Sequence, residues 1–231
     1  MKRAEGAREV LDGPVGAADL AATLADVDRL NAWFGGYALT LREVRRLAAT
    51  VPRERALIVV DVGGGSAAFA VRLAKWARRQ GRAIRVVVVE RDCASLALAR
   101  RAAAGYPEVL LVHADASALP CREGVADVVT SGLTLHHLEP EQAVESLREM
   151  LAAARVGVVV NDLLRRRLSL GLVWLATRLV RCHPISRHDG PLSVRRAYSR
   201  DELRALAEKA GASRLTIREY PALGRLLAVL S

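Results

Sequence analysis

The chain has 231 residues, of which 52% are apolar and 26% charged, and its formal net charge is +10. This length predicts one domain with a small appendage, and this composition excludes an intrinsically disordered chain. The charge would suit nucleic acid or an anionic membrane. However, lysine occurs only as Lys2, Lys75 and Lys209, so a solvated arginine-rich surface is the simpler interpretation.

No targeting, disulfide or metal signal is found. Cys93, Cys121 and Cys182 lack the spacing of a zinc site or a disulfide framework, so we expect a cytoplasmic protein without a metal ion. Residues 1–16 lack the apolar stretch of a secretory signal. The apolar run 168–177, flanked by arginines, is too short to cross a bilayer, which takes roughly 20 residues.

Residues 17–49 show helical spacing of apolar side chains, with a break at Gly35. Residues 1–50 are therefore predicted to form a helical cap on the domain that follows. From Ala56 the pattern changes to short apolar runs separated by helical stretches, which is typical of buried parallel strands. These runs are 57–60, 84–89, 109–112, 126–130 and 156–160, and helices are predicted at 67–79 and 94–104.

The C-terminal third contains a capping box, beginning at Ser199, that opens a helix closed by Gly211. Residues 215–220 and 225–230 follow as a predicted hairpin around Pro221. Between the fifth run and this helix, residues 163–198 are interpreted as a lid insertion. It would comprise an apolar helix, which packs on the core or covers a site, and a long loop over 187–198, which is either a binding loop or a solvated basic turn.

The strongest local signal is a buried strand that ends in Asp61 and a glycine-rich turn, Gly63-Gly64-Gly65, before a helix. Glycines permit positive φ and close approach of a ligand, and the helix N-terminus offers free N–H groups. A nucleotide-like ligand is therefore expected. The turn also satisfies the relaxed GxGxxA pattern of dinucleotide-binding enzymes, so a dehydrogenase is an alternative at this point.

Acidic residues follow at the ends of the next two strands. Glu90, with Arg91 after it, ends the second run, where a carboxylate can bind both hydroxyls of a ribose. Asp115 and Ala116 follow the third run, where Asp115 could accept from an adenine amino group. Because these ends meet at one edge of a parallel sheet, three consecutive acidic ends indicate one site.

In order, these motifs and the segment from Asp127 through Ser131 to His136-His137 resemble those of class I S-adenosylmethionine-dependent methyltransferases. The resemblance spans roughly 56–231 and is greatest to the group around ubiquinone and menaquinone methyltransferases. It implies a Rossmann-like α/β fold, with a seven-stranded, mostly parallel sheet whose last strand is antiparallel. The dehydrogenase alternative does not account for Asp115-Ala116 or for the paired histidines.

The resemblance also implies roles for matching residues. Asp61 and Gly63 to Gly65 would surround the methionine part of S-adenosylmethionine, and Glu90 would hold its ribose. Asp115 and Ala116 would contact the adenine, and Ser131 would contact the cofactor through its backbone. Ala67 departs from the glycine or threonine of many members but is equally small.

Methyl transfer to an oxygen acceptor needs a base, because a phenol with a pKa of about 10 is protonated at neutral pH. His136, His137 and His188 are the candidate bases, with His183 as a further histidine nearby in sequence. His136 or His137 could instead only pack or cap the next helix. Asp162, at the end of the fifth run, either joins the same rim or caps a helix.

Three segments, 30–36, 161–166 and 188–196, resemble bacterial methyltransferases that accompany type III polyketide synthases and act on phenolic lipids. This resemblance implies O-methylation of a small lipophilic phenol or quinol, with Trp33 and Trp174 lining an apolar site, and it makes peripheral membrane contact compatible with the function. C-methylation of a quinone precursor and cofactor binding without catalysis remain alternatives. A nucleic-acid methyltransferase is disfavoured, because Thr130-Ser131-Gly132-Leu133 differs from the NPPY-like turn used on bases.

Overall fold

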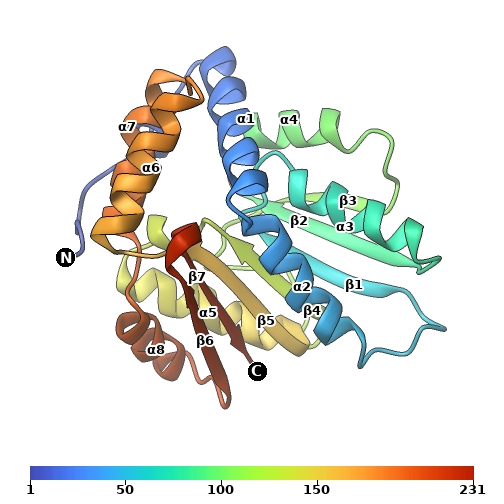
Figure 1. The fold of residues 1–231 in the computed structure, drawn as a ribbon. Helices are drawn as coiled ribbons and strands as arrows, with labels where there is room; N and C mark the ends of the chain where they lie inside the picture. The colour runs from blue at the N-terminus through green and yellow to red at the C-terminus, as the bar shows by residue number, and fades with distance from the viewer.

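A seven-stranded sheet in the order β3-β2-β1-β4-β5-β7-β6 forms the centre of the molecule, and the computed structural model describes all residues from 1 to 231 (Figure 1). β7 runs antiparallel to both of its neighbours, β5 and β6, while β1 to β5 are parallel. This confirms the predicted fold. The strands are β1 (Leu57–Val62), β2 (Ile84–Glu90), β3 (Val109–His113), β4 (Ala126–Gly132), β5 (Ala154–Leu163), β6 (Leu215–Tyr220) and β7 (Arg225–Leu230).

Eight α-helices and three short 3₁₀ turns connect and cover the strands. They are η1 (Val10–Asp12), α1 (Ala17–Trp33), α2 (Gly36–Ala48), α3 (Ala68–Arg79), α4 (Cys93–Ala102), η2 (Leu135–His137), α5 (Pro140–Ala153), α6 (Arg167–Leu179), α7 (Pro184–Arg196), α8 (Arg200–Lys209) and η3 (Pro221–Leu223). The break predicted at Gly35 is real, since this residue adopts φ +72° between α1 and α2.

Helices cover both faces of the sheet, which explains why its strands are apolar without alternation. Val59 belongs to the core layer beneath α2 and α3, together with Leu73. The next residue, Val60, points to the opposite layer beneath α5 and α8, together with Leu147. Both faces of β1 are therefore shielded from water.

The strand order reverses between β1 and β4, which are neighbours although β2 and β3 lie between them in sequence. In open α/β sheets, a crevice forms at the carboxyl ends of strands where the order reverses. In this chain the crevice is covered by α1 and by the pair α6 and α7 (Figure 1). The fold thus creates an enclosed space above β1 and β4.

The predicted loop over 187–198 is wrong, because residues 184–196 form α7, which packs against α6. Gly190 and Pro191 are residue types common in turns, and they lie within this helix. Gly190 allows close helix packing: a Cβ there would lie 3.1 Å from Val173 and 3.3 Å from Thr177. No helix in the structure is both long and apolar enough to span a membrane.

The first 16 residues differ from the predicted helical cap, since they contain only η1 before α1 begins. The segment crosses to α7, where Ala4 N–H donates to Arg195 O at 2.9 Å. The N–H groups of Val10 and Leu11 donate to the two carboxylate oxygens of Asp189, at 3.0 and 3.1 Å. These bonds hold η1 beside the crevice.

Candidate active site

One cavity of about 340 Å³ occupies the crevice. Its wall combines the turns after β1, β2 and β4 with α1, η1, α6 and α7, so segments from both ends of the chain meet there. The sequence-predicted residues that line it are Asp61, Gly63, Gly64, Gly65, Glu90, Arg91, Asp115, Ala116, His136 and His137.

The residues around the turn after β1 leave room only for glycine at Gly63 and Gly64. Gly63 has φ +69°, and a Cβ on it would lie 2.3 Å from the hydroxyl oxygen of Thr134. A Cβ on Gly64 would lie 2.6 Å from Val88. Any side chain at these positions would clash with its neighbours. Because both residues are glycine, the backbone of the turn stays accessible from the cavity.

Asp61 lies fully buried beside this turn. Its Oδ1 accepts from the Thr130 hydroxyl at 2.7 Å, whereas its Oδ2 has no hydrogen-bond partner. Burial raises the pKa of Asp61 to about 7, assisted by the nearby charge of Glu90. An unpaired buried acceptor is costly, so the site is suited to a ligand with a cationic or hydrogen-bond-donating group at this position.

Glu90 and Asp115 also line the cavity. Glu90 accepts from the backbone N–H groups of Gly65 and Asp92, each at 3.0 Å, and so also holds the glycine turn. Asp115 Oδ1 accepts from the N–H and hydroxyl of Ser117, which lower the pKa of Asp115. Ser131 is buried within β4 and does not line the cavity, whereas Gly132 and Leu133 do.

His136 is buried and bonded to Asp162 from the adjacent strand. Its Nδ1 lies 2.6 Å from Asp162 Oδ1, and its backbone N–H donates to Oδ2 at 3.0 Å. Burial would raise the pKa of Asp162, but its contact with His136 and the hydrogen bonds from the backbone of His136 and Leu163 outweigh burial and lower it. An ionised carboxylate only accepts, so we assign the proton to Nδ1, which leaves Nε2 facing the cavity. Asp162 therefore orients His136 rather than forming the cavity rim.

His137 repeats this arrangement with a different carboxylate. Its Nδ1 lies 2.8 Å from Asp12 Oδ1, and Asp12 also accepts from Arg196. Burial alone would raise the pKa of Asp12, but the bonds from His137, the Glu9 backbone and Arg196 lower it. The two imidazole rings lie 4.2 Å apart between centroids, so both Nε2 atoms face the same small volume.

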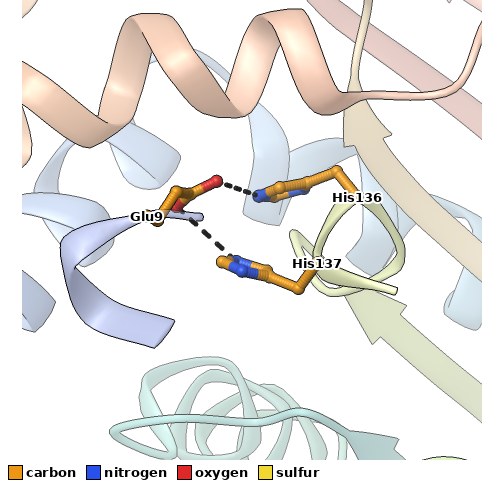
Figure 2. A group of neighbouring side chains, drawn as sticks. All are labelled: Glu9, His136 and His137. Atoms are coloured by element: carbon orange, nitrogen blue, oxygen red, sulfur yellow. Dashed lines mark ion pairs between the residues drawn. The ribbon is translucent and has the colours of Figure 1, made fainter. Parts of the chain in front are cut away.

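Glu9 completes this group, and the sequence analysis missed it (Figure 2). One carboxylate oxygen lies 3.7 Å from His136 Nε2 and the other 3.9 Å from His137 Nε2. Burial raises the pKa of Glu9 to about 7 despite His137 and the nearby Arg196. The only signal in the sequence was the acidic pair Glu9 and Asp12 in an otherwise uncharacterised N-terminal segment.

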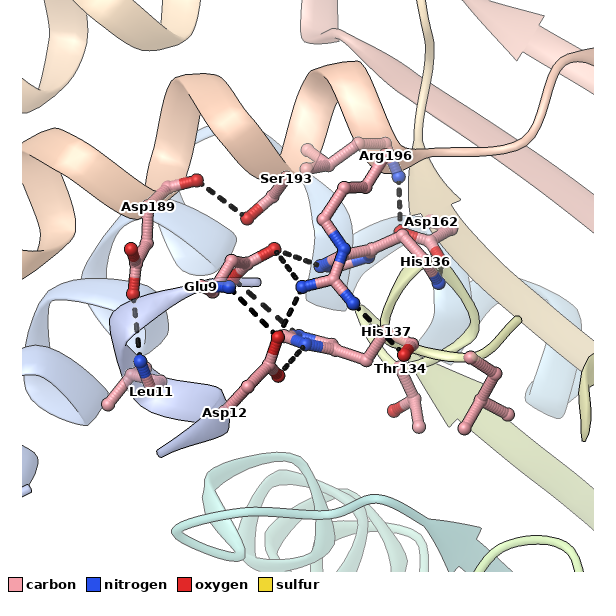
Figure 3. Close-up of polar contacts among 12 residues, drawn as sticks. Glu9, Leu11, Asp12, Thr134, His136, His137, Asp162, Asp189, Ser193 and Arg196 are labelled. Atoms are coloured by element: carbon pink, nitrogen blue, oxygen red, sulfur yellow. Dashed lines mark hydrogen bonds and ion pairs between the residues drawn. The ribbon is translucent and has the colours of Figure 1, made fainter. Parts of the chain in front are cut away.

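Figure 3 shows how this group is held in place. Arg196 from α7 pairs with Asp12 and donates to His137 O at 3.0 Å. Asp189 binds the backbone of the N-terminal segment one residue beyond Glu9. Residues about 180 positions apart in sequence therefore fix the position of the Glu9 carboxylate.

Several predicted residues lie outside the cavity. The side chains of Trp33 and Trp174 are exposed, because each lies on the outer side of its helix, and the predicted apolar lining is corrected to Phe34, Leu172 and Val173. His188 faces solvent with its Nδ1 on Asp189, so this candidate base does not reach the cavity. His183 caps α7 and is not among the lining residues either.

Arg225, at the start of β7, gives the cavity a buried positive charge. Its side chain is almost fully buried, and neither Nε nor Nη1 has a hydrogen-bond partner. Burial lowers the pKa of Arg225 to about 10 although Asp162 and Tyr37 favour its charged form. The cavity therefore contains a buried guanidinium that has no direct salt bridge, although the charge of Asp162 is near.

Residues 59–157 match the family described as "Methyltransferase domain", and no curated protein matches the chain. Three solved structures share the fold. The CMeT domain of the citrinin polyketide synthase is 12% identical, with a TM-score of 0.62, 81% of this chain covered and 49% of that one. A SAM-dependent methyltransferase from Aquifex aeolicus is 16% identical, with a TM-score of 0.60 and coverages of 83% and 88%. A candidate O-methyltransferase from Nostoc punctiforme is 16% identical, with a TM-score of 0.66 and coverages of 99% and 64%.

The sheet order is that of the class I S-adenosylmethionine-dependent methyltransferase fold, and the match over residues 59–157 places the glycine turn within a methyltransferase domain. Its cofactor is accordingly S-adenosyl-L-methionine. The residues present fit this group, because the unpaired Asp61 oxygen and the open glycine backbone suit a ligand with an ammonium group and a sulfonium. The dehydrogenase alternative is set aside.

Proposed function

We propose that this methyltransferase acts on the oxygen of a small, lipophilic phenol or quinol. The observation that carries the proposal is the pair His136 and His137, each oriented by a carboxylate, in the same cavity as the glycine turn. The resemblance of three segments to methyltransferases of phenolic lipids supports the same acceptor class.

The cofactor roles expected from the sequence become part of this proposal. Asp61 and the glycine turn bind the methionine part, Glu90 binds the ribose, and Asp115 with Ala116 contacts the adenine. Gly132 and Leu133 take the backbone role expected of Ser131, since they line the cavity and Ser131 does not. When bound, S-adenosylmethionine supplies an electrophilic methyl carbon, so no covalent enzyme intermediate is needed.

The protein's own contribution is to orient the acceptor and remove its proton. A phenol has a pKa of about 10, so a neighbouring base increases the fraction of phenolate. Nε2 of His136 or His137 accepts this proton, and the ionised Asp162 or Asp12 stabilises the imidazolium that results. The Glu9 carboxyl group lies close to both rings, and its ionised form adds to this stabilisation.

An apolar wall supports a lipophilic acceptor. Leu11 from η1, Phe34 after α1, and Leu172 and Val173 from α6 all line the cavity. On the outside of α6, large apolar side chains are exposed beside arginines, and this surface suits peripheral contact with a membrane that holds such an acceptor. The exposed residues are Leu168, Trp174, Leu175 and Leu179. The free cysteines agree with action in the cytoplasm.

C-methylation of a quinone precursor is the second candidate. It uses the same cofactor site and the same histidines, because ionising a phenol also activates its ring carbons. The similar folds include both a CMeT domain and a candidate O-methyltransferase, so the choice of oxygen rests on the histidine pair and the resemblance.

The test is incubation of the protein with methyl-labelled S-adenosylmethionine and a panel of alkylated resorcinols and quinols. We expect a labelled product one CH₂ heavier than its acceptor, with the label in a methoxy signal by NMR. A label on a ring carbon would establish C-methylation instead. Tight cofactor binding without turnover on any member of the panel, or on a cell extract, would contradict enzymatic methyl transfer.

A further inference from the structure

The Glu9–His136–His137 group contains three metal-ligand side chains whose free atoms face one another (Figure 2). The three free ligand atoms all lie within 4.8 Å of one another. We propose that this group binds one divalent transition-metal ion, such as Zn²⁺, a site for which the cysteine spacing gave no indication. Its suggested role in catalysis rests on the proposed function, but the binding of the ion does not.

The distances suit an ion between the three side chains. Ligands at about 2.0 to 2.2 Å from a tetrahedral Zn²⁺ lie about 3.3 to 3.6 Å from each other. One Glu9 oxygen lies 3.7 Å from His136 Nε2 and the other 3.9 Å from His137 Nε2, and the three ligand atoms lie within 4.8 Å of one another, so the side chains would draw together around the ion. Two histidines and one carboxylate leave a coordination position open for a fourth ligand.

The surroundings of the histidines have the form of an outer coordination sphere. Metal-bound histidines commonly donate their other ring N–H to a carboxylate, which fixes the tautomer and the ring orientation. Both histidines do so, His136 to Asp162 at 2.6 Å and His137 to Asp12 at 2.8 Å. Each Nε2 is thereby left as a lone pair directed toward Glu9.

The electrostatics also favour a cation at this position. Two imidazole lone pairs and the Glu9 carboxylate converge, and the buried Oε1 of Glu9 has no hydrogen-bond partner, although Arg196 Nη1 lies 3.5 Å from it. In the network of Figure 3, the carboxylates of Asp12, Asp162 and Asp189 surround the group, with Arg196 as the permanently charged cation. A divalent ion between the three ligand atoms would be attracted by these carboxylates.

All three ligands line the cavity, so the open coordination position faces the acceptor. A hydroxyl oxygen bound there loses its proton to solvent more readily, because the ion stabilises the oxyanion. In the metal-loaded enzyme both Nε2 atoms are ligands, so the ion takes over the activation of the acceptor hydroxyl, and the general-base role of the histidines belongs to the metal-free protein.

The experiment is a titration of the chelator-treated, full-length protein with Co²⁺, followed by visible absorption, with Zn²⁺ competition. We expect one equivalent of Co²⁺ to give ligand-field bands that Zn²⁺ abolishes. Glu9→Gln, which keeps the shape of the side chain, should weaken Co²⁺ binding by at least about 10-fold, and His137→Gln should do the same. The control Glu145→Gln should bind as the wild type does, since this carboxylate is exposed on α5 and lies outside the cavity.

Absence of stoichiometric Co²⁺ binding would overturn the proposal, as would equal affinity in the wild type and in the folded Glu9→Gln and His137→Gln variants. Circular dichroism and S-adenosylmethionine calorimetry on each variant separate loss of the site from loss of the fold. If methyl transfer persists but no Co²⁺ binds, the metal site is refuted and the proposed function stands. Stoichiometric Co²⁺ binding without methyl transfer supports the metal site and counts against the proposed function.

Discussion

His136 Nδ1 lies 2.6 Å from Asp162 Oδ1, so the turn after β4 and the end of β5 share one buried hydrogen bond. The bond exists because β4 and β5 are paired in parallel, with Gly132 opposite Asn161, which precedes Asp162. This pairing determines which nitrogen of His136 faces the acceptor.

Asp162→Asn should therefore reduce turnover while leaving cofactor binding intact. An asparagine that presents its amide N–H₂ to Nδ1 favours the tautomer protonated on Nε2, which cannot accept a proton from the acceptor. We expect kcat to fall by about 100-fold or more, the scale of general-base catalysis, with S-adenosylmethionine affinity unchanged by calorimetry. Full activity in the folded variant would show that the orientation of His136 does not matter; His188→Ala is the matched control.

Glu90→Ala should weaken S-adenosylmethionine binding by about 1.5 to 3 kcal/mol, the scale for hydrogen bonds to a charged group. Glu90 also accepts from Gly65 N–H, so the loss includes some ordering of the glycine turn. Calorimetry measures the affinity, and chemical denaturation checks the fold. An unchanged dissociation constant would remove Glu90 from the cofactor site.

Asp61 predicts a pH dependence of stability in the cofactor-free protein. Its pKa is raised to about 7 by burial, so between about pH 4 and 7 the folded state retains a proton that the unfolded state has lost. The stability that comes with protonated Asp61 is fully present below pH 4. As the pH rises toward 7, the free energy of unfolding falls by at most about 1.4 kcal/mol per pH unit. Asp61→Asn should lack this loss and gain stability relative to the wild type from pH 5 to 7 in urea titrations. If the difference in free energy of unfolding between the variant and the wild type is the same at every pH from 5 to 7, the pKa of Asp61 is not raised.

Arg225→Met should stabilise the ligand-free protein. The guanidinium is buried, and two of its nitrogens lack partners, whereas methionine is apolar and adaptable. By analogy with the replacement of buried ion pairs, we expect the free energy of unfolding to rise by about 1 to 4 kcal/mol. The same variant should bind S-adenosylmethionine or the acceptor more weakly if Arg225 serves an anionic group of either. A lower midpoint of denaturation would show that Arg225 is stabilising as it stands.

The exposed apolar side of α6 predicts binding to anionic lipid. Leu175 and Leu179 are 47% and 72% exposed, and Arg178 and Arg181 lie beside them in sequence. Leu175→Ser with Leu179→Ser should reduce co-sedimentation with phosphatidylglycerol vesicles without altering turnover on a water-soluble acceptor. Equal sedimentation of the wild type and the double variant would argue against a membrane role for this helix.

The sequence alone determined the sheet and singled out residues at the strand ends that line the cavity. Strand runs, the glycine turn and the acidic strand ends are local patterns, and their order along the chain leads to the class of methyltransferase. For the same reason, Asp61, Glu90 and Asp115 could be placed without coordinates. The helix α7 was missed because Gly190 and Pro191 are typical of a turn, whereas here Gly190 serves close packing against α6.

Only the tertiary structure decided what faces the acceptor. Glu9 reaches His136 and His137 because Asp189 and Arg196, about 180 residues away in sequence, fix the N-terminal segment. Trp33 and Trp174 turned outward and His188 turned to solvent because of the rotation of their helices, which depends on which face each helix packs. Such contacts between distant segments leave no periodic pattern in sequence, since they arise from packing and charge pairing after the chain has folded.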